Sequence, residues 1–398
     1  MKKLLLGTTT LVAAGLLAGG IASAEDKKPA PIQLSIGGYW FGFLVGVSQD
    51  TGVGEPGNNI RPYGISQKGM LRFKGSTTLD NGLQAGVRVE FRTETCGDQV
   101  DESWMWFDSQ YGRVELGSTT SAPNKMWYGA PTPILGQAIN SPGFVYIRTG
   151  ANSIGPTGLG SPTTYITYGL DKSEKVTYFT PRVVGFQFGA SYTPDRCKEN
   201  VAVNGGLACG GSFSGLPASN NVGQQSEIWE LGLNYTNKFG DFDVGAFGGY
   251  AHSHIEANPA GNLKDEQEFA LGASVTYNAI NVGGGYRYDN LGNKFAPGGA
   301  TPTTGTKQQD WNIGALYTIG DWSFGATYHH TSTQIKNAAG AGVGHDTLNG
   351  VVAGGTYVLG PGINLTGGVQ YWDLSAFNGA PANENTAWVY LIGTKLEF

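Results

Sequence analysis

Apolar and polar side chains alternate along much of the chain, most regularly after residue 226. The segment 229–235 is representative, and its apolar members are Trp229, Leu231, Leu233 and Tyr235. Alternation with a period of two over such lengths predicts β-strands with one apolar face. Short turns such as Gly320-Asp321 join these strands in pairs. Long polar segments separate one pair from the next, at 253–265, 290–308 and 374–385.

The second face of the predicted strands is polar and carries Gln, Asn, Ser, Thr and Gly, with occasional charges such as Glu268 and Arg287. In a soluble sandwich this face would point to water, and the strands would usually be shorter. In a transmembrane barrel the apolar face meets lipid and the polar face lines a lumen. Short turns at one end and long loops at the other are also typical of outer-membrane barrels.

Tyrosines recur at both ends of the alternating segments. One set precedes the short turns: Tyr235, Tyr277, Tyr317 and Tyr357. The other set lies near the long polar segments: Tyr250, Tyr288, Tyr328 and Tyr371. The interval from Ile280 to Tyr288 spans about 20 Å in a strand tilted by roughly 40°. Because outer-membrane barrels have an apolar band about 25 Å tall between aromatic girdles, the spacing favours a transmembrane barrel.

The same reasoning over the whole chain predicts 16 strands, an even number that leaves both termini on the periplasmic side. The expected spans are 32–47, 67–78, 82–95, 100–109, 112–118, 173–181, 185–194, 226–236, 242–252, 266–277, 280–289, 309–318, 322–333, 346–359, 363–373 and 386–398. Between the fifth and sixth strands, residues 119–172 form a long third external loop, and loops of this length are usually functional. The predicted fold is all-β, a transmembrane antiparallel barrel formed by residues 25–398 as one domain.

The composition supports this class. Glycine accounts for 64 of the 398 residues, and charged residues make up only 14%, against about 25% in a typical globular domain. The one long apolar run, Leu4 to Ile21, follows two lysines and ends at Ala22-Ser23-Ala24, which predicts a signal peptide over 1–24 that is cleaved before Glu25. Loss of its two lysines changes the net charge from −6 to −8. Since nucleic-acid binding needs a basic surface, no nucleic-acid partner is expected.

Residues with catalytic or metal-binding chemistry are few. Cys197 and Cys209 bracket a Gly-rich stretch, and both a local disulfide and two free thiols remain open for them, while Cys96 has no assigned partner. Four histidines near external strand ends are expected on an exposed polar rim: His252, His254, His329 and His330. No Gly-x-Ser-x-Gly elbow, phosphate loop or metal-ligand spacing is present. We therefore expect no enzyme, no catalytic residue, no metal and no cofactor.

Several stretches resemble Gram-negative general-diffusion porins of the alpha-proteobacterial type. They are LRFKGSTTLDNG (71–82), YGRVELG (111–117), KVTYFTPRVVGFQFGASY (175–192) and the closing strand to Phe398. The resemblance implies a homotrimer of 16-stranded barrels in outer-membrane lipid, in which loop 119–172 folds inward to narrow each pore. The aromatic C-terminus is similar to the signal that the outer-membrane assembly machinery reads. The implied function is passive diffusion of small hydrophilic solutes and ions.

Alternation assigns charged side chains to the lumen in the second, third and fifth strands. The lumen-facing residues are Arg72, Lys74, Arg88, Glu90, Arg92, Arg113 and Glu115. Charges on the lipid face would be costly. One interpretation is a basic ladder that forms half of a transverse field across the constriction. The alternative is that these cations pair with Glu90, Glu94 and Glu115 and mainly keep the wall wetted.

The long loop departs from the pattern of the porins it resembles, which usually carry acidic residues there. No Asp or Glu lies between Glu115 and Asp171, and the loop offers Lys125 and Arg148 instead. Since basic rings favour anions, the hypothesis is a weak anion preference or near neutrality at the constriction. Two other functions remain open: a solute-specific channel that prefers anions or sugars, and a non-conducting structural or adhesive barrel.

Overall fold

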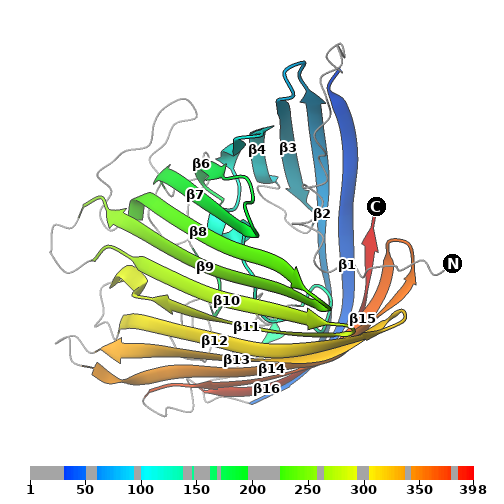
Figure 1. Ribbon diagram of the computed structural model, residues 1–398. Helices are drawn as coiled ribbons and strands as arrows, with labels where there is room; N and C mark the ends of the chain where they lie inside the picture. Colours follow the sequence, from blue (N-terminus) through cyan, green and yellow to red (C-terminus); the bar gives the residue numbers. More distant parts are fainter. Residues whose placement is uncertain are drawn as a thin grey trace.

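The computed structural model describes residues 31–50, 61–93, 100–137, 146–147, 162–167, 172–195, 225–257, 264–293, 304–336, 342–377 and 384–398. These residues form sixteen β-strands that close into one antiparallel barrel, each strand pairing with its neighbours in sequence (Figure 1). The predicted all-β antiparallel barrel of 16 strands is therefore confirmed. The predicted signal peptide 1–24, Arg148, Cys96, Cys197 and Cys209 lie outside the described residues.

The strands correspond one to one with the predicted spans. In chain order they are β1 Gln33–Gln49, β2 Tyr63–Thr78, β3 Gln84–Arg92, β4 Val100–Ser109, β5 Gly112–Ser118, β6 Glu174–Phe179, β7 Phe186–Asp195, β8 Gln225–Phe239, β9 Phe242–Ile255, β10 Gln267–Tyr277, β11 Ile280–Asp289, β12 Thr304–Ile319, β13 Trp322–Lys336, β14 Gly342–Gly360, β15 Ile363–Ser375 and β16 Asn385–Glu397. A short helix, α2 (Ala122–Lys125), lies between β5 and β6, and a 3₁₀ turn, η4 (Leu291–Asn293), follows β11. Among the described helices, none is long and apolar enough to cross a membrane.

The predicted boundaries are least accurate at the long-loop ends of the strands. β12 begins at Thr304 and β14 at Gly342, upstream of the predicted starts at 309 and 346, and β13 continues past 333 to Lys336. These extensions consist mostly of polar residues and glycine, with Ile335 and Val343 as isolated apolar residues, so they lack the regular alternation that predicts a strand. Strand β3 is instead shorter than predicted, because it ends at Arg92 and not at residue 95.

Most of the large apolar side chains of the strands point outward. Leu271 on β10 and Ile313 on β12 are each 55% exposed, whereas Ala270 and Asn312 beside them are buried on the inner face. Aromatic rings pair across neighbouring strands at both ends of this outer surface. The pairs at the short turns are Phe186–Tyr235, Phe242–Tyr277 and Trp322–Tyr357, and those at the long loops are Tyr192–Trp229, Trp311–Tyr328 and Tyr371–Trp388.

The barrel closes between β1 and β16, where Val45 is in register with Leu391. The amide of Gly38 donates to the carbonyl of Phe398 at 2.8 Å, and the amide of Phe398 donates to the carbonyl of Gly38 at 3.1 Å. The terminal aromatic residue is thus joined to the first strand by two backbone hydrogen bonds. These bonds pair backbone groups that an open edge would leave unsatisfied in lipid.

Candidate functional site

The basic residues predicted on β2, β3 and β5 lie on the inner face of the barrel, where β2 and β3 are neighbours and β4 separates β3 from β5. Lys74 is the register partner of Arg88, and Arg72 that of Glu90. The residues that alternate with them along the same strands point outward. Among these, Phe73 is 40% exposed and Val87 is 46% exposed. We define the cationic wall by its five members: Arg72, Lys74, Arg88, Arg92 and Arg113.

Two buried carboxylates form ion pairs with this cationic wall. Glu90 Oε1 lies 3.2 Å from Arg72 Nε, and the same carboxylate also pairs with Arg88. Glu115 accepts a hydrogen bond from Arg113 Nε at 2.8 Å. Each carboxylate thus offsets charge on the wall and holds guanidinium groups in place.

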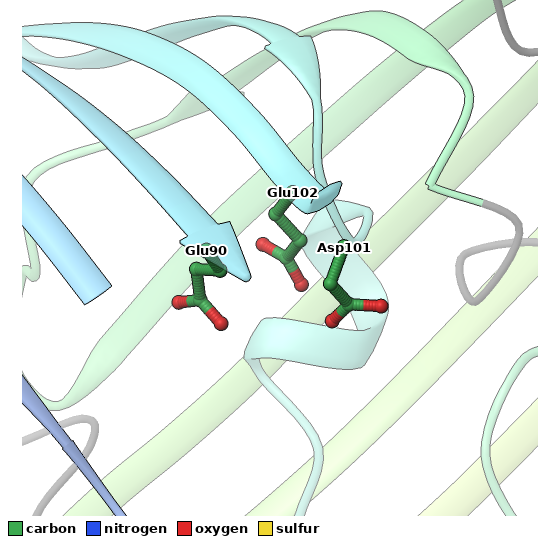
Figure 2. Close-up of side chains that lie close together, drawn as sticks. All are labelled: Glu90, Asp101 and Glu102. Atoms are coloured by element: carbon green, nitrogen blue, oxygen red, sulfur yellow. The ribbon is translucent and has the colours of Figure 1, made fainter. Parts of the chain in front are cut away.

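A further acidic group lies at the long-loop end of the cationic wall. Carboxylate oxygens of Glu90, Asp101 and Glu102 lie within 4.8 Å of one another (Figure 2). Arg92 Nη2 lies 2.5 Å from Asp101 Oδ1, while Lys172 pairs with Asp101 and lies 3.4 Å from Glu102 Oε1. Arginine and lysine side chains pair with these carboxylates, so the group forms an ion-pair network.

Three charged residues of this site, Asp101, Glu102 and Lys172, are not predicted by the alternation of faces. The register between β3 and β4 shifts between Glu90 and Phe91, so that Glu90 pairs with Glu102 but Phe91 pairs with Val100. A bulge of this kind places one unpaired residue in the strand and breaks the alternation of faces. Strict alternation therefore could not place two consecutive acids at the same site.

Two tryptophans support the cationic wall from the inner face of β4. Trp104 and Trp106 are buried, with ring centroids 5.3 Å apart. Lys74 Nζ lies 5.4 Å from the Trp106 centroid, and the Arg113 guanidinium lies 5.4 Å and 5.1 Å from the two rings. A cation over an indole face is stabilised by the ring quadrupole. Alternation does not predict which face Trp104 and Trp106 occupy, because Met105 and Phe107 beside them are apolar as well.

Lys125 extends the basic surface from the loop side. It ends helix α2, where its ammonium pairs with Glu115 and lies 4.4 Å from the Trp104 centroid. Burial lowers the pKa of Lys125 from its ordinary value, and the nearby Glu115 carboxylate offsets part of this effect. The positive charge of Lys125 is therefore lost at a lower pH than that of an ordinary lysine.

The described part of the loop between β5 and β6 follows the inner wall of the barrel. In chain order its contacts are Pro123 with Gly232 (β8), Tyr128 with Gly245 (β9) and Gly272 (β10), Gly129 with Gly283 (β11), Pro131 with Thr327 (β13), Ile134 with Gly354 (β14) and Gly368 (β15), and Gly136 with Phe41 (β1). These contacts advance strand by strand around the wall, and none of those named here involves β2 or β3. Figure 1 shows the same segment, in cyan, within the outline of the barrel.

Two apolar clusters fix this path. Ile134 is fully buried among side chains of β1, β14, β15 and β16, including Phe41, Phe43 and Val352. Met126 packs on the other side of the lumen with Phe179 and Phe247. Gly136 has a positive φ of 81°, and a Cβ there would stand 2.6 Å from the Phe41 ring, so the chain needs glycine at this point.

The second described arm of the loop, residues 162–167, is tied to a buried polar network on β10 to β13. The Thr167 amide donates to Glu268 Oε2 at 2.6 Å. Arg287 Nη2 donates to Asp310 Oδ2 at 3.0 Å, and His329 Nε2 lies 3.6 Å from Asp310 Oδ1. His329 is fully buried, so the expectation of an exposed rim is wrong for this residue. Its ring lies on the inner face of β13 and is covered within the network.

Cations outnumber carboxylates at this site. The cations are Arg72, Lys74, Arg88, Arg92, Arg113, Lys125 and Lys172, and the carboxylates are Glu90, Asp101, Glu102, Asp108 and Glu115. Within the described residues, Lys74 has no carboxylate at ion-pair distance, and Trp106 is the group over which its ammonium lies. The arrangement can attract anions electrostatically, because excess positive charge in a narrow passage lowers their energy there.

Comparisons of the fold agree with this architecture. A trimer form of OmpT, an outer membrane protein of Vibrio cholerae, superposes with a TM-score of 0.58 at 14% identity, covering 93% of this chain and 100% of that chain. An anion-selective porin from Comamonas acidovorans superposes with a TM-score of 0.55 at 15% identity, covering 92% of this chain and 100% of that one. At these identities the likeness shows a shared fold.

Comparisons of the sequence identify the family. Uncharacterized proteins of Rickettsia bellii and Rickettsia typhi are 23% and 22% identical, with both chains covered completely. The model of the Gram-negative porin family matches residues 8–376. The chain therefore belongs to the Gram-negative porin family and forms a transmembrane barrel of the outer membrane.

Proposed function

We propose that this protein forms a water-filled channel for passive diffusion of small hydrophilic solutes and ions. Barrels of sixteen strands leave an aqueous passage in their centre. The loop over 119–172 narrows the passage, and the cationic wall forms the opposite side of the constriction. The observation that carries the proposal is the loop path, which follows β8 to β15 and β1 and leaves β2 and β3 to face it.

The wider setting follows from the same proposal. The segment 1–24 directs export and is cleaved, and the strand that ends at Phe398 is read by the assembly machinery of the outer membrane. The mature chain works as a homotrimer in outer-membrane lipid, as the porins it resembles do. Transport is passive, so we assign it no catalytic residue, metal or cofactor.

The channel prefers anions weakly. Acidic partners neutralise most of the cationic wall, but Lys74 and the excess of cations leave positive charge at the constriction. The described loop residues from 119 to 137 include Lys125 and no acid. The name of the Comamonas acidovorans relative indicates that this fold can host an anion preference.

Liposome swelling tests the proposal. Purified, refolded protein in liposomes should admit small neutral sugars quickly and exclude oligosaccharides as their size increases. Heat-modifiable migration on gels verifies that the barrel is folded before each assay. If folded protein gives no more swelling than empty liposomes, the loop closes the lumen, and a structural or adhesive barrel replaces the channel.

A further inference from the structure

Two glycines on the inner wall opposite the cationic wall lie directly against the loop backbone. A Cβ built on Gly272 of β10 would collide with the carbonyl oxygen of Tyr128 and stand 3.1 Å from its carbonyl carbon. A Cβ on Gly283 of β11 would collide with the carbonyl oxygen of Gly129. The Tyr128–Gly129 backbone thus occupies the space that two side chains would fill.

Backbone conformation does not explain these two glycines. Neither Gly272 nor Gly283 has a positive φ, so an L-amino acid can adopt the backbone geometry of either position. At Gly272 the next nearest neighbour after Tyr128 is the carbonyl oxygen of Gly284, at an ordinary 3.5 Å. The close approach of the loop is therefore the feature that requires glycine at position 272.

We propose that Gly272 and Gly283 are positioning residues that set the width of the pore, although neither contacts a passing solute. Without side chains, β10 and β11 let the loop lie flat against the wall. A methyl group at Gly272 displaces the Tyr128–Gly129 backbone toward the cationic wall, because tightly packed strands move less readily than a loop. A methyl group at Gly283 would also stand 2.9 Å from the carbonyl oxygen of Ala273 on β10, so Gly272 is the position at which the loop alone requires glycine. This inference rests on the proposed channel function and identifies what fixes its size limit.

The test compares G272A with G248A. Gly248 lies on the outer face of the neighbouring strand β9, where a Cβ meets only Leu271 Cδ2 at an ordinary 3.5 Å. Single-channel conductance and the sugar size limit in liposome swelling are measured for both variants and for the parent protein. We expect lower conductance and a smaller size limit for G272A, and parental values for G248A.

The outcomes separate this inference from the function on which it rests. A parent protein that does not conduct refutes the channel itself. A conducting parent with a folded G272A variant of equal or higher conductance overturns the positioning role alone. If G272A does not fold, the same substitution is made in a chain that lacks residues 126–130 and that folds with glycine at position 272. Recovery of folding then supports the loop collision, and continued misfolding overturns it.

Discussion

At the scale of single residues, the cationic wall consists mostly of shared charges. Arg72 and Arg88 share Glu90, Arg92 and Lys172 share Asp101, and Arg113 and Lys125 share Glu115. Lys74 differs because its ammonium lies over Trp106. The selectivity of the pore should therefore depend more on Lys74 than on the cations of the wall that share a carboxylate.

Replacing Lys74 by glutamine should shift the zero-current potential in a salt gradient toward cations. The reason is that this substitution removes positive charge that no described carboxylate offsets. Lys238 provides the control, since it is exposed at the short-turn end of β8, 3.5 Å from Asp243. K238Q should keep the parental potential, and an equal shift in both variants would argue against a local role for Lys74.

Lys125 should make selectivity depend on alkaline pH. Burial lowers its pKa, so its positive charge is lost at a lower pH than that of an ordinary lysine, which titrates near about 10.4. As pH rises, the anion preference of the parent should weaken before the exposed lysines titrate. The zero-current potential of K125Q, measured over the same pH range, should lack this early change. An identical pH profile in the two proteins would contradict the assignment.

At the scale of elements, the last strand closes the barrel through its final residue. Deleting Phe398 removes both hydrogen bonds to Gly38 and the terminal aromatic ring. Less folded protein should then reach the outer membrane, which the heat-modifiable fraction in membrane extracts measures. F398Y retains an aromatic ring and the backbone bonds and should assemble normally. Normal assembly of the truncated chain would show that closure does not depend on this residue.

The strands could be predicted from sequence because lipid imposes one apolar face on each of them. Alternation does not predict the inner-face positions whose residue type depends on contacts with other segments. On β1, Phe41 and Phe43 are apolar on the inner face because Ile134 of the loop packs on them. On β4 a bulge brings Asp101 and Glu102 together, and on β13 the network around Asp310 buries His329. These positions depend on contacts between distant segments, which no local pattern contains.

At the scale of the whole molecule, the net charge is opposite in sign to the charge that the proposed anion preference requires at the pore. The chain is acidic, with a net charge of −6, whereas cations outnumber carboxylates at the site formed by the cationic wall, Lys125 and Lys172. Surface charges act over a Debye length of about 8 Å at physiological ionic strength. Solutes in the proposed constriction should therefore respond more strongly to the cationic wall and Lys125 than to acids on the outer surface of the protein.

Single-channel current in planar bilayers under a potassium chloride gradient tests the account most directly. Folded parent protein should open in steps that occur in multiples of three, as a homotrimer of open pores requires. Its zero-current potential should have the sign of a weak anion preference. A strongly cation-selective potential would contradict the role of the cationic wall, and silence from folded protein would contradict the channel itself.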